Sequence, residues 1–165
     1  SMDRERHLFL QTADIGIIGS EPESKSFKIA DAAIRGVEAT ANGLFIVNFP
    51  AAAIAAETGD LAKTVEAVQF IDTCLEGVVG QICKRNGAVL ITASHCGCEN
   101  VMVSGTSDPV AEPADISVPL LVVDPADAGA RLAPGGSPAD IAPTLLGILG
   151  VEKPAEMTGR DLRIG

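Results

Sequence analysis

The chain has 165 residues, with 12 Lys and Arg against 22 Asp and Glu, which gives a formal net charge of −10. This acidic balance argues against nucleic-acid and anionic-membrane partners, because both bind through a basic face. Hydrophobic residues make up 47% of the chain but aromatic residues only 3%, so we expect a globular fold with an aliphatic core and no aromatic platform for stacked bases. No apolar run approaches the length of a membrane span and the first residues carry no signal-peptide core, so we expect a cytoplasmic protein.

The first third of the chain predicts a helix followed by a buried strand. Residues 1–20 are weakly patterned, and an edge strand is expected at 7–10. Apolar residues at helical spacing predict a helix over about 25–40. The run 44–49, Leu-Phe-Ile-Val-Asn-Phe, is short, apolar and rich in β-branched and aromatic residues. It predicts a strand buried on both faces, as in a parallel sheet.

The middle of the chain repeats this alternation. An alanine-rich loop at 51–57 leads into the strongest helical pattern, over about 60–85, with Asp60 as its expected cap. A second buried strand is predicted at 88–92. The segment 93–117 then has little periodicity, which is unusual in a compact domain unless the segment has a function.

The last third predicts one more strand and one more helix. A strand is expected at 118–123. Ser137, Pro138 and Asp140 form a helix start, with Ser at the N-cap, and the helix is expected to end near residue 149. The tail at 157–162 is expected at the surface. Strands alternating with helices favour a single three-layer α/β domain over residues 1–165, with a mainly parallel sheet.

Five segments, in order, resemble one known family. They are Asn48-Phe49 with Thr58-Gly59, Ala67 to Leu75, Leu90 to Gly97, Ala139 to Leu146, and Pro154 to Gly159. Together they resemble the C-terminal part of the phosphatase domain of 2,3-bisphosphoglycerate-independent phosphoglycerate mutases, in the alkaline phosphatase superfamily. The resemblance implies an alkaline-phosphatase-like fold that is incomplete relative to the family.

The resemblance also implies a chemistry, which this chain does not fully support. Family members hold two divalent ions, usually manganese or zinc, with Asp and His, and they use a serine nucleophile to carry the phosphoryl group. The expected ligand positions fall here on Ala53, Glu57 and Ser94, and only His95 is retained. The family segment that supplies the serine has no counterpart in the chain. A single imidazole cannot hold a catalytic ion, because such sites need three or four convergent ligands.

We therefore expect no catalytic residue and no bound cofactor in the chain alone. The weak metal-ligand candidates are His95, Glu57, Cys96 and Cys98, and manganese or zinc would be the ion if any activity is retained. Cys74 and Cys83 lie nine residues apart on the predicted helix, on opposite faces, so we expect them to be free thiols.

Three functions stay open from the sequence. The favoured one is a degenerate, catalytically inactive mutase-like domain with a structural or regulatory role, acting as a homodimer or through a protein partner that covers an open sheet edge. The second is a phosphoglycerate-mutase-like isomerase or phosphohydrolase activity that is retained, or restored by a partner chain. The third is a metal-binding or redox module built on His95, Cys96 and Cys98. Binding of a small phosphate ligand also stays open.

Overall fold

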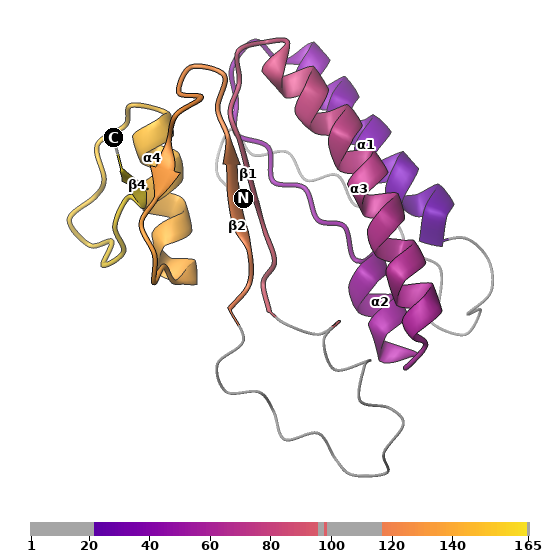
Figure 1. Cartoon of the computed structure of the whole chain (residues 1–165). Helices are drawn as coiled ribbons and strands as arrows, with labels where there is room; N and C mark the ends of the chain where they lie inside the picture. The colour runs from indigo at the N-terminus through magenta and orange to yellow at the C-terminus, as the bar shows by residue number, and fades with distance from the viewer. Residues whose placement is uncertain (1–21, 96–97, 99–116, 165) are drawn as a thin grey trace. The chain divides into compact units, whose positions relative to one another are not determined.

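The computed structural model describes residues 22–95, 98 and 117–164 (Figure 1). The strand expected at 7–10 and the candidate ligand Cys96 lie outside the described residues. The described residues fall into two compact units, one with 22–78 and 98, the other with 79–95 and 117–164. Within the described ranges, no helix is both long enough and apolar enough to cross a membrane.

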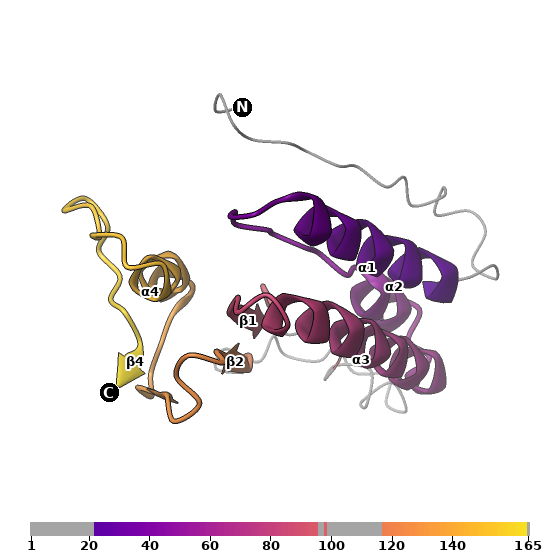
Figure 2. The same cartoon turned by 90° about the horizontal axis from the view of Figure 1, so that it is seen from above.

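The first unit is helical. It contains α1 (Pro22–Ala39), α2 (Ala51–Glu57) and most of α3 (Leu61–Cys83), which confirms the helices predicted over about 25–40 and 60–85. The expected loop at 51–57 is wrong, because these residues form α2. Figure 2 shows α1 and α3 side by side, with α2 next to them. The rings of Phe27 on α1 and Phe70 on α3 meet edge to face, with centroids 6.3 Å apart.

Small side chains form the core of this unit. Ala51 and Ala55 of α2 pack on Ala67 of α3, and Ile71 packs against this cluster. Alanine at these contacts lets the helices approach closely, and alanine is also the best helix former. The larger apolar residues of α3 behave differently, because Leu61, Val65 and Val68 remain 44–48% exposed.

The prediction of a buried strand at 44–49 is wrong for the described structure. These residues form no strand, and Leu44 and Ile46 are 57% and 89% exposed. A strand needs a neighbouring strand to pair its backbone groups, and no described residue forms a ladder with this segment. The apolar run is present, but apolar character alone does not make a strand where no described residue pairs with it.

The second unit holds the strands. β1 (Val89–Thr92) and β2 (Leu120–Val123) confirm two predicted strands, with Val89 opposite Val123. The pair is antiparallel, as is the short pair β3 (Arg131–Leu132) with β4 (Arg163–Ile164). The expected parallel pairing is therefore wrong for both described ladders. An apolar run indicates burial of a strand but not the direction of its neighbour.

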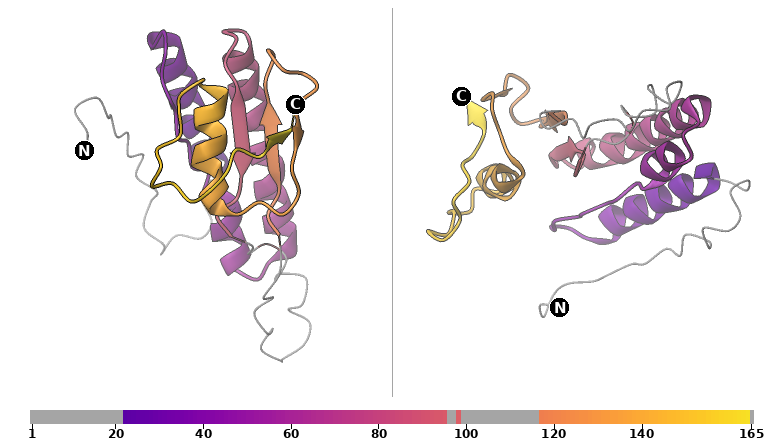
Figure 3. Two further views of the ribbon diagram at one scale, coloured as in Figure 1. Left: turned by 90° about the vertical axis from the view of Figure 1, so that its left-hand side faces the viewer. Right: turned by 90° about the horizontal axis from the view of Figure 1, so that it is seen from below.

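The chain ends in a helix with a segment folded against it. The 3₁₀ turn η2 (Pro138–Asp140) leads into α4 (Ile141–Ile148), which confirms the helix predicted from the Ser-Pro-x-Asp start. Figure 3 shows α4 next to the C-terminal segment in both of its views. The expectation that the tail lies at the surface is wrong at Leu162, whose side chain is only 2% exposed.

Candidate functional site

The frame of the first candidate loop is built by local hydrogen bonds. The Thr58 hydroxyl donates to the Ala55 carbonyl at 2.6 Å, which ends α2. Gly59 then takes a left-handed conformation (φ 71°), which glycine adopts without steric cost. Asp60 begins α3, since its Oδ1 accepts the Lys63 N–H at 3.1 Å, and this bond holds the pKa of Asp60 below its usual value. The predicted cap at Asp60 is thus confirmed.

Helix α2, which precedes this loop, is poor in metal ligands. Residues 53 and 57 are four apart on α2, so their side chains lie on one face of the helix, and both residues are exposed. This is the spacing that could present two ligands to one ion. Ala53 has no donor atom, which leaves Glu57 with a single carboxylate at the end of α2. A metal contact at Glu57 stays a prediction.

The second candidate loop follows β1. Thr92, the last residue of β1, donates its hydroxyl hydrogen to the Pro119 carbonyl at 2.9 Å, next to the start of β2. Ser94 and His95 come next, and both are exposed. The Ser94 hydroxyl and His95 Nδ1 are 2.8 Å apart, so Nε2 is the ring nitrogen that could face a metal.

The cysteines that the structure describes add no cluster of ligands. Cys98 belongs to the first unit, is half-buried, and has its Sγ 3.9 Å from the Ala52 carbonyl oxygen. Cys74 and Cys83 are free thiols, as predicted. Burial raises the pKa of the Cys74 thiol, which keeps it protonated and unreactive.

The described residues do not fit a two-metal centre. Among them, no group of three or more His, Cys, Asp or Glu side chains could hold an ion. In the first unit, Glu57 offers one carboxylate beside the methyl group of Ala53. In the second, His95 offers one nitrogen beside a serine hydroxyl. Divalent catalytic ions need more convergent charged donors than either place provides.

A polar cluster around Asp140 has a structural role, and only part of it has a local signal in the sequence. Asp140 is buried, with Oδ1 accepting the Arg160 N–H at 2.7 Å and Oδ2 accepting the Ser137 N–H at 2.7 Å. These two hydrogen bonds hold the pKa of Asp140 below its usual value, and the bond from the Arg160 N–H has the larger effect. The capping pair of Ser137 and Asp140 was visible in the sequence, but the bond to Arg160, twenty residues later, carries no local signal.

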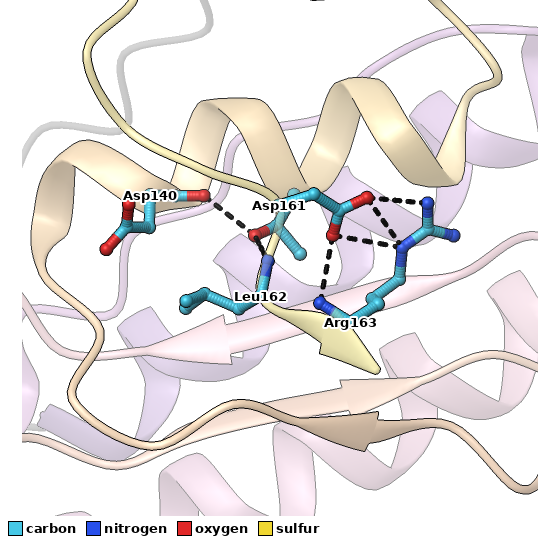
Figure 4. Close-up of polar contacts among 5 residues, drawn as sticks. Asp140, Asp161, Leu162 and Arg163 are labelled. Atoms are coloured by element: carbon cyan, nitrogen blue, oxygen red, sulfur yellow. Dashed lines mark hydrogen bonds and ion pairs between the residues drawn. The ribbon is translucent and has the colours of Figure 1, made fainter. Parts of the chain in front are cut away.

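The same cluster continues along the tail. The Thr144 hydroxyl donates to the Asp140 carbonyl at 2.7 Å and accepts the Leu162 N–H at 3.1 Å (Figure 4). Thr144 is fully buried. The Arg163 guanidinium pairs with Asp161 at 2.7 Å, and this contact lowers the pKa of that carboxyl group. The tail is therefore fastened to α4 and is part of the folded unit.

Comparisons with known proteins identify the family. Residues 4–153 match the Metalloenzyme superfamily. The phosphoglycerate mutase (2,3-bisphosphoglycerate-independent) of Rhodopirellula baltica is 34% identical over 149 residues, which cover 90% of this chain and 27% of that protein. The enzyme of the same name from Desulforudis audaxviator is 34% identical over 96% of this chain and 30% of that protein.

A solved structure gives the same answer for the fold. A phosphoglycerate mutase of Leishmania mexicana, determined at low cobalt concentration, matches with a TM-score of 0.69 at 21% identity, over 88% of this chain and 29% of that one. The fold is thus alkaline-phosphatase-like, and the chain spans about 30% of the relatives it matches. The resemblance to phosphoglycerate mutases is confirmed, and the chain belongs to the Metalloenzyme superfamily.

Proposed function

We propose that this chain is a phosphoglycerate-mutase-like domain that does not transfer phosphoryl groups by itself and acts through contacts with another protein. The observation that carries the proposal is the content of α2. Ala53 and Glu57 occupy the two positions, on one exposed helix face, where the resemblance implies an Asp and a His as metal ligands.

The chemistry of the family supports this reading. Two metal ions accelerate phosphoryl transfer by holding the attacking and leaving oxygens and neutralising the charge on phosphate. Each ion needs several anionic or imidazole ligands. A methyl group at Ala53 supplies none, and Ser94 places a neutral hydroxyl against His95 where an anionic carboxylate is implied. When one ligand of such a site is lost, the remaining ligands no longer hold the ion in its coordination geometry.

An activity assay tests the proposal. The full chain is incubated with 3-phosphoglycerate, or with a chromogenic phosphate monoester, in the presence of millimolar Mn²⁺ or Zn²⁺. The Rhodopirellula baltica enzyme serves as the positive control. We expect no turnover above that of the His95→Ala variant. Turnover that is abolished by a chelator and lost in His95→Ala would refute the proposal.

The proposal extends to the architecture. The three-layer sandwich that the alternation of strands and helices predicts would form when further strands join the elements of this chain. Both described ladders are two-stranded, and the described structure leaves residues 44–49 without a pairing strand. Isolated two-stranded sheets are marginally stable, so further strands would stabilise the fold.

A further inference from the structure

The sequence contains two Asn-Gly pairs, Asn42-Gly43 and Asn86-Gly87. Asparagine followed by glycine is prone to spontaneous deamidation, because glycine has no side chain to shield its backbone nitrogen. That nitrogen attacks the Cγ atom of the asparagine side chain, ammonia leaves, and a cyclic imide forms. Water then opens the imide on one side or the other, which leaves aspartate or isoaspartate. A backbone nitrogen that is held in a hydrogen bond has to be released before it can attack.

The backbone nitrogen of Gly87 is held at the end of α3. It donates to the Ile82 carbonyl oxygen at 3.0 Å, and the Asn86 N–H donates to the Cys83 carbonyl oxygen, also at 3.0 Å. With Asn86 in the left-handed conformation (φ 57°), these two bonds form a Schellman-type helix end. Gly87 is also closely packed, since a Cβ atom there would lie only 2.7 Å from Ile82 Cγ2. The helix end must therefore open before Gly87 can react with Asn86.

The backbone nitrogen of Gly43 is under no such constraint. Asn42 and Gly43 are both exposed and follow the end of α1. Within the first unit, no described hydrogen bond involves the Gly43 N–H or the Asn42 side chain. The nitrogen of Gly43 can therefore approach Asn42 Cγ without first breaking a described hydrogen bond of that unit.

From this contrast we infer that Asn42 is a site of spontaneous deamidation in the folded chain and that Asn86 is protected. The Gly43 nitrogen bonds to Asn42 Cγ, the C–N bond of the side-chain amide breaks, and the amide nitrogen leaves as ammonia with the proton from the Gly43 nitrogen. One water molecule then hydrolyses the imide, and no oxidant, metal or second protein takes part. The site goes beyond the proposed function, because it uses none of the candidate metal ligands.

The product places a negative charge just beyond α1. The last turn of this helix contains Glu38 and no basic residue. The C-terminal end of a helix carries a partial negative charge of its own, so a carboxylate at position 42 weakens the last turn. We expect the amides of that turn to exchange about two- to fivefold faster in Asn42→Asp than in the unmodified chain. Equal exchange would overturn this part of the inference.

Ageing of the purified full chain tests the site itself. The chain is kept in buffer at neutral pH, and its digested peptides are followed by mass spectrometry, which detects the exchange of an amide NH₂ group for OH. We expect modification at Asn42 to be at least about fivefold faster than at Asn86, because the Gly87 hydrogen bond has to open first. In guanidinium chloride the two rates should become similar, because neither pair is then held by the fold.

Gly43→Ala is the matched variant. The nearest neighbour of a Cβ atom at this position would be Thr40 Cγ2 at 3.4 Å, so alanine fits. Its methyl group shields the nitrogen, and modification of Asn42 should be lost over the time in which the unmodified chain reacts, with the rate at Asn86 unchanged. Unchanged exchange of the α1 amides shows that the variant is folded.

Three results would overturn the assignment of Asn42. They are a folded chain in which Asn86 reacts as fast as Asn42 or faster, a chain in which Asn42 reacts only in denaturant, and a rate at Asn42 that Gly43→Ala leaves unchanged.

Discussion

Truncating Leu162 should destabilise the second unit strongly, although it lies in a polar tail. Its side chain is 2% exposed, and a Cβ atom on Gly136 would lie only 2.7 Å from its Cδ1, so the side chain is tightly enclosed. Leu162→Ala removes three carbon atoms, worth about 2.4 kcal/mol at roughly 0.8 kcal/mol each. The cavity left behind raises the expected loss to about 2–5 kcal/mol.

The matched control is Ile164→Ala, two residues further on in β4. Ile164 is 52% exposed, so we expect its truncation to cost about 0.5 kcal/mol or less. Circular dichroism would report mainly on the long helices of the first unit, so the assay is hydrogen exchange of the α4 amides. A loss of 2 kcal/mol speeds exchange from the open state by about 30-fold. Equal exchange rates in Leu162→Ala, Ile164→Ala and the unmodified chain would refute the packing described for the tail.

Three further predictions concern the same fold. The pKa of Asp140 is lowered by the N–H groups that donate to its carboxylate, so its stabilisation is present above the unfolded pKa of about 4 and is lost as pH falls through the lower folded value. Urea titrations should therefore show the stability gap between the unmodified chain and Asp140→Asn narrowing as pH falls below about 4, and a constant gap would contradict this. Gly159→Ala should cost about 1–3 kcal/mol, because a Cβ there would overlap the backbone carbonyl oxygen of Ala139 within η2, whereas Gly129→Ala, with open space at that position, should be silent in the same titration. Iodoacetamide should label Cys83 well before Cys74, whose thiol is 2% exposed and has a raised pKa, and equal rates by mass spectrometry would argue against the burial of Cys74.

Elements with a strong local signal could be predicted from the sequence. α1 and α3 follow from apolar spacing, and α4 follows from the cap formed by Ser137 and Asp140. Each of these signals lies within a few residues of the element it specifies. This is why tertiary context was not needed to find them.

Features that depend on distant neighbours could not be predicted. The run 44–49 has strand character, but whether it forms a strand depends on another strand lying beside it. The burial of Leu162 depends on Gly136 and Thr144, and a single apolar residue in a polar tail has no period to reveal it. The antiparallel direction of β2 against β1 likewise has no signal in an apolar run.

The candidate site was predicted only as far as the resemblance reached. Ala53, Glu57 and Ser94 were located by comparison with the family pattern. In the structure Ala53 and Glu57 share an exposed helix face, and Ser94 contacts His95. Composition and spacing alone do not identify Ala53 as the position of a lost ligand, because an alanine side chain has no donor atom.

Manganese binding tests the central claim most directly. Mn²⁺ is added to the full chain and to a double variant, Ala53→Asp with Glu57→His on one face of α2, and the free ion is followed by electron paramagnetic resonance. The account predicts that the unmodified chain leaves the free-ion signal equal to that of buffer, and that any gain in binding appears only in the double variant. Stoichiometric loss of the signal with the unmodified chain, reversed by His95→Ala, would contradict the account.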